Sequence, residues 1–374
     1  MKVVGIQTIF RDVLLTNYGS FFQHYALRFI LARMGCRSYR CESGRFRDEL
    51  STCIFVIRKI GMRVLSLFGL CNNPEALGIR QVLLRYCFIR DFRRLIGPIF
   101  ENQNERTDLF LAGGDSVWCS NECKYYLLDR DGRVPRVSYA ASASWDKGLL
   151  DTNWIQNIKE VVRTYKCIGV REITGVKAIQ SICPRSRVEQ VVDPVLLMTR
   201  NDILRVCDKK KSIFKEKTLL YYVVNIWQEP DLNLNVLEQV ADILGCHLKI
   251  IGIQGGEDFI PAKYRVSPSP IQFLAMIRDA DYFVTNSFHG IVFSLILCKK
   301  FAFIKQSGRR YGDQNCRQRD FLDMFALTCH MVSSHPSTDS LLGALRQNID
   351  EVALNVRIEN ERRRSLDWLT EAVA

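Results

Sequence analysis

The sequence has no run that approaches about 18 uninterrupted apolar residues, which argues against a membrane-spanning helix. It also has no internal repeat and no low-complexity segment. An apolar stretch at residues 1–10 stops at Arg11, so it is typical of a buried strand rather than of a secretion signal. Hydrophobic residues make up 47% and charged residues 25%, which excludes disordered and collagen-like proteins. At roughly 150 residues per domain, the 374 residues predict two domains.

Metal-binding patterns are also missing, although the chain contains 14 cysteines. Cys119 and Cys123 form the tightest pair, but no second pair and no histidine lies at zinc-finger spacing from them. Most other cysteines lie in apolar runs, where cysteine behaves as a small hydrophobic residue. We therefore expect no metal site. Without a secretion signal, reduced thiols and a cytoplasmic location are the simplest expectation.

Acidic residues are scarce in the first half of the chain. Lys and Arg number 52 in total against 40 Asp and Glu, a formal net charge of +12. Residues 1–200 hold 30 basic and 19 acidic side chains, whereas residues 201–374 hold 22 and 21. This asymmetry predicts an anionic partner, namely nucleic acid, an anionic membrane surface or a phosphorylated substrate. We expect no nucleic acid, because no reader motif is present and few aromatics are arranged for base stacking.

Short apolar segments alternate with amphipathic segments along most of the chain, and strands separated by helices form parallel sheets with covered faces. The predicted fold class is therefore α/β, with two Rossmann-like domains that face a central cleft and a C-terminal helix. The predicted domains are residues 1–200, 201–340 and a helical extension at 341–374, with a polar break at 199–217. Strands are predicted at 3–8, 37–41, 108–112, 136–140, 166–170, 188–192, 219–224, 247–253, 281–285 and 301–304, and helices at 20–34, 151–164, 173–182, 232–244, 270–279, 290–298 and 341–372.

Residues 54–96 interrupt this alternation with a basic, amphipathic insertion. The segment holds eight Lys and Arg residues against Glu75 and Asp91. One interpretation is a surface that touches anionic lipid. The other interpretation is a helical hairpin packed on the first domain with a solvated basic face. It is favoured because amphipathic helices are common in globular proteins.

Ligands of such sheets bind at the carboxyl ends of the strands, and the loop after strand 281–285 carries the strongest signal there. The strand enters Thr-Asn-Ser and then an apolar helix, whose free N–H groups, with Ser287 and Gly290, predict an anion site. His289 at the mouth of this site can hold a phosphate or carboxylate, or move a proton. A lone histidine is more often structural, but a strand-to-helix turn favours function.

Arg171 carries the second signal, because it follows a predicted strand and opens a helix. Its guanidinium can bind a phosphate or carboxylate through two hydrogen bonds. The alternative is an exposed ion pair with Glu172, which is a common arrangement.

Three further loops carry weaker signals. Two glycines before Asp115 let the backbone approach a ligand, although Gly-Gly-Asp is also an ordinary turn. Asp193 precedes a proline and is interpreted as the end of a strand. Asn17 lies in the first strand-to-helix loop and is a candidate for the cleft.

Together these loops resemble the polysaccharide pyruvyltransferase family. The likeness covers nearly the whole chain in the right order, and Thr-Asn-Ser-Phe-His-Gly is its most specific block. The chain departs from the family at 113–118, where Gly-Gly-Asp-Ser-Val-Trp replaces the usual Gly-Ser-Asp-Gln-Val-Trp. The matching stretches are 17–19 with Gln23 and 25–27, 113–118, 137–142, 169–172 with Gly175, 192–194 with 196–197, 281–290, Asn315 with Arg317, and Ser365 with 368–369.

The resemblance implies a GT-B-like fold and transfer of pyruvate from phosphoenolpyruvate onto two hydroxyls of one sugar, which gives a cyclic ketal and phosphate. The acceptor would be a glycan or lipid-linked saccharide at the inner face of the cytoplasmic membrane, where the protein would bind peripherally. The co-substrate would be phosphoenolpyruvate, with no cofactor and no metal. His289 and Arg171 would be catalytic, Asn286, Ser287, Phe288 and Gly290 would bind the donor, and Asn17, Gly114, Asp115, Ser116 and Arg317 would contact the acceptor or line the cleft.

Two other functions fit the same features. A nucleotide-sugar glycosyltransferase of GT-B fold would also need a phosphate site in the second domain. A membrane-associated scaffold without activity would keep the fold but would not need both Arg171 and His289.

Overall fold

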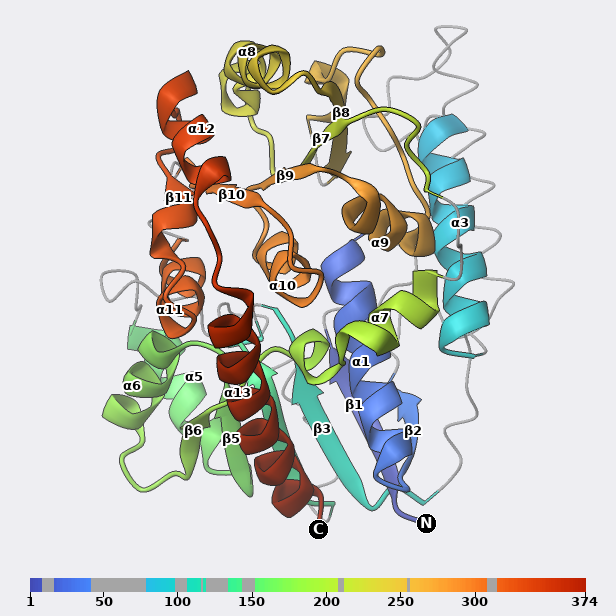
Figure 1. Cartoon of the computed structure of the whole chain (residues 1–374). Helices are drawn as coiled ribbons and strands as arrows, with labels where there is room; N and C mark the ends of the chain where they lie inside the picture. Colours follow the sequence, from blue (N-terminus) through green and yellow to red (C-terminus); the bar gives the residue numbers. More distant parts are fainter. Residues whose placement is uncertain are drawn as a thin grey trace, which may run out of the picture.

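The computed structural model describes residues 1–8, 17–41, 79–97, 106–115, 117–118, 134–142, 152–207, 212–253, 256–307 and 315–374. These residues form two lobes, each built on one sheet (Figure 1). The strand order is β2-β1-β3-β4-β5-β6 in the first sheet and β11-β10-β9-β7-β8 in the second. All neighbouring strands are parallel, which confirms the predicted α/β class with two Rossmann-like lobes.

The elements follow the predicted alternation closely. The strands are β1 Val3–Thr8, β2 Arg37–Arg40, β3 Leu109–Gly113, β4 Arg136–Ala141, β5 Cys167–Val170, β6 Val188–Gln190, β7 Thr218–Val224, β8 His247–Ile253, β9 Tyr282–Thr285, β10 Phe301–Ile304 and β11 Met331–Val332. The α-helices are α1 Tyr18–Arg33, α3 Ile79–Leu95, α5 Thr152–Val162, α6 Ile173–Ile182, α7 Arg200–Cys207, α8 Leu234–Leu244, α9 Pro270–Asp279, α10 Phe288–Ile296, α11 Cys316–Met324, α12 Thr338–Arg346 and α13 Glu351–Val373.

Strand β7 shows why these segments form strands that are covered on both faces. All seven of its residues are buried, and alternate side chains enter different cores. Tyr221 belongs to the core that α8 and α12 complete, whereas Tyr222 packs edge-on against Phe273 of α9. A continuous apolar run is what a parallel strand between two helical layers requires.

Helix α1 joins the two lobes. Asn17 caps it by accepting a hydrogen bond from the Ser20 N–H at 3.0 Å, so the helix begins at Tyr18 and not at the predicted residue 20. At its first turn, the Tyr18 ring stacks on Phe273 of the second lobe at 4.2 Å, and its hydroxyl donates to the Pro268 carbonyl oxygen at 2.7 Å. The core around α1 therefore includes residues of both lobes.

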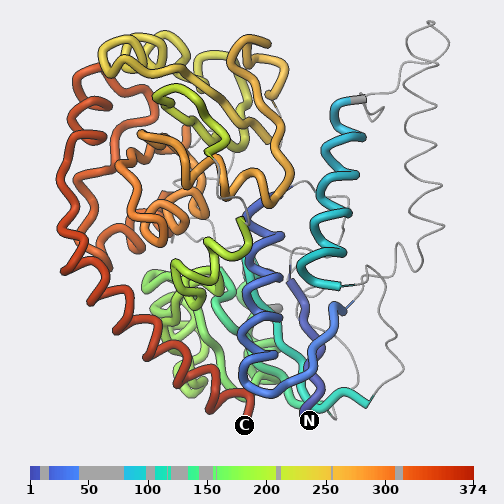
Figure 2. The backbone as a smooth tube through the Cα atoms, turned by 45° about the vertical axis from the view of Figure 1, so that its right-hand side comes forward, coloured from blue at the N-terminus to red at the C-terminus, as the bar shows by residue number. Residues whose placement is uncertain are grey.

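Helix α3 is the part of the basic insertion that the structure describes, since residues 54–78 lie outside the described residues. It stands beside α1 at the side of the molecule (Figure 2). Phe88 and Phe92 pack edge-on against Phe21 of α1. Asp91 accepts a hydrogen bond from the Ile271 N–H at 3.0 Å, at the start of α9. The helix thus contacts both lobes and not the first alone.

The predicted C-terminal helix is confirmed as α13, but its predicted start near residue 341 is wrong, because a separate helix, α12, precedes it. Helix α12 covers the second sheet, and α13 returns along the first lobe (Figure 1). In α13, Arg362 donates to the Leu196 and Met198 carbonyl oxygens, and Trp368 packs against Tyr139 of β4. These buried contacts determine the position of α13 on the first lobe. The periodicity of the sequence does not reveal them.

The polar break predicted at 199–217 is also partly wrong, because α7 occupies its first half. Asp202 accepts from the Thr199 N–H at 2.9 Å and thereby stabilises the first turn. Helix α7 packs against α9 of the second lobe. Among the helices in the described part of the chain, none has the length and apolarity needed to cross a membrane.

Candidate active site

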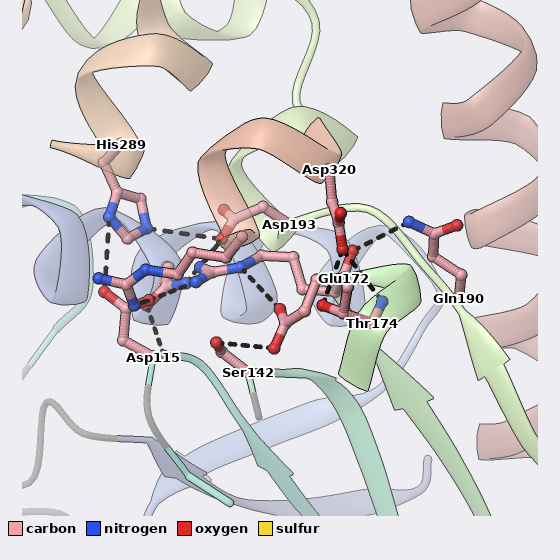
Figure 3. Close-up of polar contacts among 11 residues, drawn as sticks. Asp115, Ser142, Glu172, Thr174, Gln190, Asp193, His289 and Asp320 are labelled. Atoms are coloured by element: carbon pink, nitrogen blue, oxygen red, sulfur yellow. Dashed lines mark hydrogen bonds and ion pairs between the residues drawn. The ribbon is translucent and has the colours of Figure 1, made fainter. Parts of the chain in front are cut away.

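Charged side chains from both sheets meet where the strands end. Asp115, Arg171 and Asp193 follow β3, β5 and β6 of the first lobe. His289 lies in the first turn of α10, directly after β9 of the second lobe. In Figure 3, dashed lines join the His289 ring to the carboxylates of Asp115 and Asp193. The two residues predicted to be catalytic, Arg171 and His289, therefore lie at the same place between the lobes and share the same two carboxylates.

Arg171 is almost completely enclosed, with 1% of its side chain exposed. One terminal nitrogen lies 2.6 Å from Asp115 Oδ1 and the other lies 3.0 Å from Asp193 Oδ2. The guanidinium lies 3.7 Å from the centre of the Phe288 ring, a cation–π contact with the second lobe. The alternative of an exposed pair with Glu172 is wrong, since both side chains are buried and Nε is 3.8 Å from the carboxylate.

His289 is buried, with 3% exposed, and not at an open loop mouth as the sequence predicts. Its Nε2 lies 3.5 Å from Asp193 Oδ2, and its Nδ1 lies 3.8 Å from Asp115 Oδ2. These are ion-pair distances and longer than strong hydrogen bonds. Such spacing is common where a catalytic bond tightens only when substrate binds.

Asp193 and Gln23 are functional candidates that the sequence did not identify as such. The Gln23 amide donates to Asp193 Oδ2 at 2.6 Å, while its oxygen accepts from the Asp115 N–H at 3.3 Å. Asp193 Oδ1 accepts from the Val195 N–H at 3.0 Å and begins a short helix at Pro194–Leu197. The sequence feature that could have identified Asp193 is its position after a strand, at the same sheet edge as Arg171.

Ion pairing overrides burial at both aspartates. Burial alone would raise the pKa of Asp115, but Arg171, Arg317 and His289 together hold it well below its usual range. Burial would likewise raise the pKa of Asp193, and His289 and Arg171 lower it. For Arg171, burial disfavours the charge, but Asp115, Asp193 and Glu172 raise its pKa further above neutrality. The aspartates and Arg171 are therefore charged at neutral pH.

Of the other residues predicted to line the cleft, some lie at the site and others do not. Arg317 reaches Asp115 Oδ1 at 3.3 Å from α11 and so joins the site. Gly114 has a φ of 102°, which favours glycine, and it lies beside Gln23. Asn17 caps α1, and Ser116 lies outside the described residues.

The residues predicted to bind the donor surround the start of α10. The Asn286 side chain accepts from the Val224 N–H and donates to its carbonyl oxygen, at 2.8 and 2.9 Å, so it fixes the end of β7. Ser287 precedes the helix without a side-chain cap. The Phe288 ring contacts the Arg171 guanidinium. Gly290 packs so close to Thr285 that a Cβ at position 290 would collide with it. Their roles toward a donor stay predictions.

Gly19 gives a direct test of the contact between the lobes. An alanine Cβ there would collide with the His289 ring, so we expect Gly19→Ala to cost about 1–3 kcal/mol of unfolding free energy and to displace His289. Chemical denaturation and activity should both show the loss. Gly343→Ala is the matched control, since that helical glycine has open space around it, and it should stabilise the protein by about 0.5–1 kcal/mol. Equal stability of the two variants would contradict the contact.

Comparison with solved structures agrees with a GT-B-like fold. The chain is similar to UDP-GlcNAc 2-epimerase from Neisseria meningitidis, with 12% identity, a TM-score of 0.51, and 99% of this chain and 100% of that chain covered. It is also similar to UDP-GlcNAc 2-epimerase from Methanocaldococcus jannaschii, with 11% identity, a TM-score of 0.51, and 98% and 100% covered. At these identities the likeness concerns the fold alone. No curated protein sequence matches the chain.

Sequence comparison with protein families identifies the chain more closely. The family described as polysaccharide pyruvyl transferase matches residues 17–308, which is most of the chain. The matched range contains Asp115, Arg171, Asp193 and His289, the four residues that meet between the lobes. The chain belongs to the polysaccharide pyruvyl transferase family.

Proposed function

We propose that the protein transfers pyruvate from phosphoenolpyruvate onto two hydroxyls of a glycan or lipid-linked sugar, which forms a cyclic ketal and releases phosphate. Family membership supports pyruvyl transfer. The observation that carries the donor assignment is the convergence of Arg171 and His289 on one buried spot between the lobes. A small, densely charged donor requires cationic and N–H groups at one place. The scheme uses no cofactor and no metal.

The donor has to compete with the carboxylates that now hold these cations. Asp115 is the most exposed of these carboxylates, and it forms ion pairs with both Arg171 and Arg317. We propose that the donor's phosphate or carboxylate takes the place of Asp115 on these two guanidiniums. Gly114, whose backbone conformation favours glycine, precedes Asp115 and permits the loop to move. The released Asp115 carboxylate then faces the acceptor hydroxyl.

The chemistry assigns a proton to each step. The His289 imidazolium gives its proton to the methylene carbon, which makes the adjacent carbon electrophilic. The first sugar hydroxyl bonds to that carbon and passes its proton to Asp115. The bond between this carbon and the bridging oxygen then breaks, and phosphate leaves with the electron pair and takes up the proton held by Asp115. Arg171 offsets the charge of the departing phosphate. The second hydroxyl closes the ketal and returns a proton to His289.

Incubation with either phosphoenolpyruvate or nucleotide sugars tests this proposal against the glycosyltransferase. A panel of lipid-linked and free saccharides serves as acceptors, and released phosphate, released nucleotide and acceptor mass are measured. Pyruvyl transfer predicts phosphate release that depends on the acceptor. Nucleotide release would support the glycosyltransferase. No turnover with any donor, combined with intact biological output of Arg171→Ala and His289→Ala, would support the scaffold.

We also propose that the protein contacts the anionic face of a membrane through α3. Leu83 and Tyr86 are 60% and 62% exposed on this helix, one turn apart. Arg90 and Arg93 are exposed on the same helix, and its only acidic residue, Asp91, is buried. Exposed apolar side chains beside arginines fit an anionic lipid surface.

Vesicle flotation tests the membrane contact. We expect the protein to float with phosphatidylglycerol vesicles and not with phosphatidylcholine vesicles, and the double variant Leu83→Ser, Tyr86→Ser to float markedly less. The matched control is Val352→Ser, Val356→Ser, which removes two exposed apolar side chains from α13. Equal flotation of both double variants would contradict a contact through α3.

A further inference from the structure

We propose that Asp193 is a positioning residue that keeps His289 protonated when the lobes are in contact. The inference rests on the proposed function, in which His289 supplies a proton to the donor. Asp193 belongs to the first lobe and His289 to the second, so the proton donor is assembled from both. Neither the family match nor the structural neighbours assign a role to Asp193.

Asp193 is held too firmly to follow the imidazole if the lobes separate. Its side chain is completely buried and accepts hydrogen bonds from Gln23 at 2.6 Å, from Arg171 at 3.0 Å and from the Val195 N–H at 3.0 Å. These partners all belong to the first lobe. Among the residues that the structure describes, the contact of Asp193 across the lobes is the 3.5 Å approach to His289 Nε2.

The His289 ring is buried, and one of its nitrogens faces a carboxylate. The ring is almost fully enclosed, and a buried imidazole without a partner loses its proton readily. Within the described residues, its buried Nε2 has no hydrogen-bond partner other than this approach to Asp193. A proton on Nε2 would therefore face the Asp193 carboxylate.

The groups around His289 come from several elements. Asp115 after β3 lies 3.8 Å from Nδ1, and it is shared with Arg171 after β5 and Arg317 of α11. Because both guanidiniums bind Asp115, and the proposed donor displaces it, Asp115 is the less dependable partner of the imidazole. Asp193 alone stays next to Nε2 throughout that exchange. This difference singles out Asp193 as the group that keeps the proton on His289.

Histidine NMR in the absence of substrate measures this role directly. The chain has five histidines, and His289→Gln assigns the signal. In Asp193→Asn we expect the His289 signal to change from the protonated to the neutral position at a pH about one unit lower than in the wild type, a roughly tenfold loss of proton affinity. The matched control is Asp202→Asn, which alters a buried helix-capping carboxylate of α7 and should leave the signal unchanged.

Activity gives the second readout. We expect the alkaline limb of the pH–rate profile of Asp193→Asn to move to lower pH with the NMR signal, and Asp193→Glu, which keeps the charge, to restore much of the wild-type profile. If Asp193→Asn does not fold, Asp193→Glu provides the test. Its His289 signal should change near the wild-type pH, and a change at a pH as low as that expected for Asp193→Asn would overturn the inference. An unchanged His289 signal in Asp193→Asn would overturn it as well. A shifted signal in a protein that never releases phosphate from phosphoenolpyruvate would instead overturn the proposed function.

Discussion

His289→Gln is expected to lower kcat for pyruvyl transfer by roughly 100- to 10,000-fold, the usual contribution of a general acid. Glutamine can still donate a hydrogen bond, but it cannot deliver a proton to carbon. Because the side chain is buried between the lobes, we also expect a loss of about 1–3 kcal/mol in unfolding free energy. Single-turnover kinetics and thermal melts measure the two effects separately.

His330→Gln is the matched control for this variant. His330 is also fully buried, stacks on Phe301 and contacts the Phe301 carbonyl oxygen through Nδ1 at 2.9 Å, away from the site. It should lose stability while kcat is kept. If His289→Gln retained kcat, or if both variants lost activity equally, His289 would have a structural role only.

Arg171→Lys is expected to raise the KM for phosphoenolpyruvate by roughly tenfold to a hundredfold, as the loss of a charged hydrogen bond implies. Lysine keeps the positive charge, but a point charge cannot bind through two parallel hydrogen bonds or stack flat on Phe288. It would also leave Asp115 or Asp193 without its buried partner. Donor titration calorimetry gives the affinity directly.

Arg187→Lys separates this effect from the loss of any forked ion pair. Arg187 binds both carboxylate oxygens of Glu371, at 2.8 and 2.9 Å, on the exposed surface. Exposed pairs contribute about 0–1 kcal/mol, so stability and donor affinity should hardly change. Unchanged donor affinity in Arg171→Lys would remove the donor role from that residue.

Apart from the two-residue edge strand β11, the strands could be predicted because each has a local signature. The apolar run at β7 and the Thr-Asn-Ser turn after β9 mark strands and strand ends without any tertiary information. In a parallel sheet the carboxyl ends meet at one edge, so Arg171 after β5 and His289 after β9 could be placed in the cleft. Their convergence follows from topology.

The surroundings of these two residues could not be predicted in the same way. Gln23 and Asp193 are 170 positions apart and meet only through the packing of α1 against the first lobe. Their sequence neighbourhoods resemble an ordinary helix face and a strand end. The path of α13 back to β4 likewise depends on burial of Trp368 far from its own position in the chain. Contacts between residues so far apart in the chain produce no periodic pattern in the sequence.

The most direct test follows the bridging oxygen of phosphoenolpyruvate. With heavy oxygen placed between carbon and phosphorus, and with the reaction run in D₂O, mass spectrometry of both products reports which bonds break and form. The account predicts that the heavy oxygen leaves in phosphate and that the ketal methyl group on the sugar carries one deuterium. Heavy oxygen retained in free pyruvate, with no mass gain on the acceptor, would mean that the site only hydrolyses the phosphate ester.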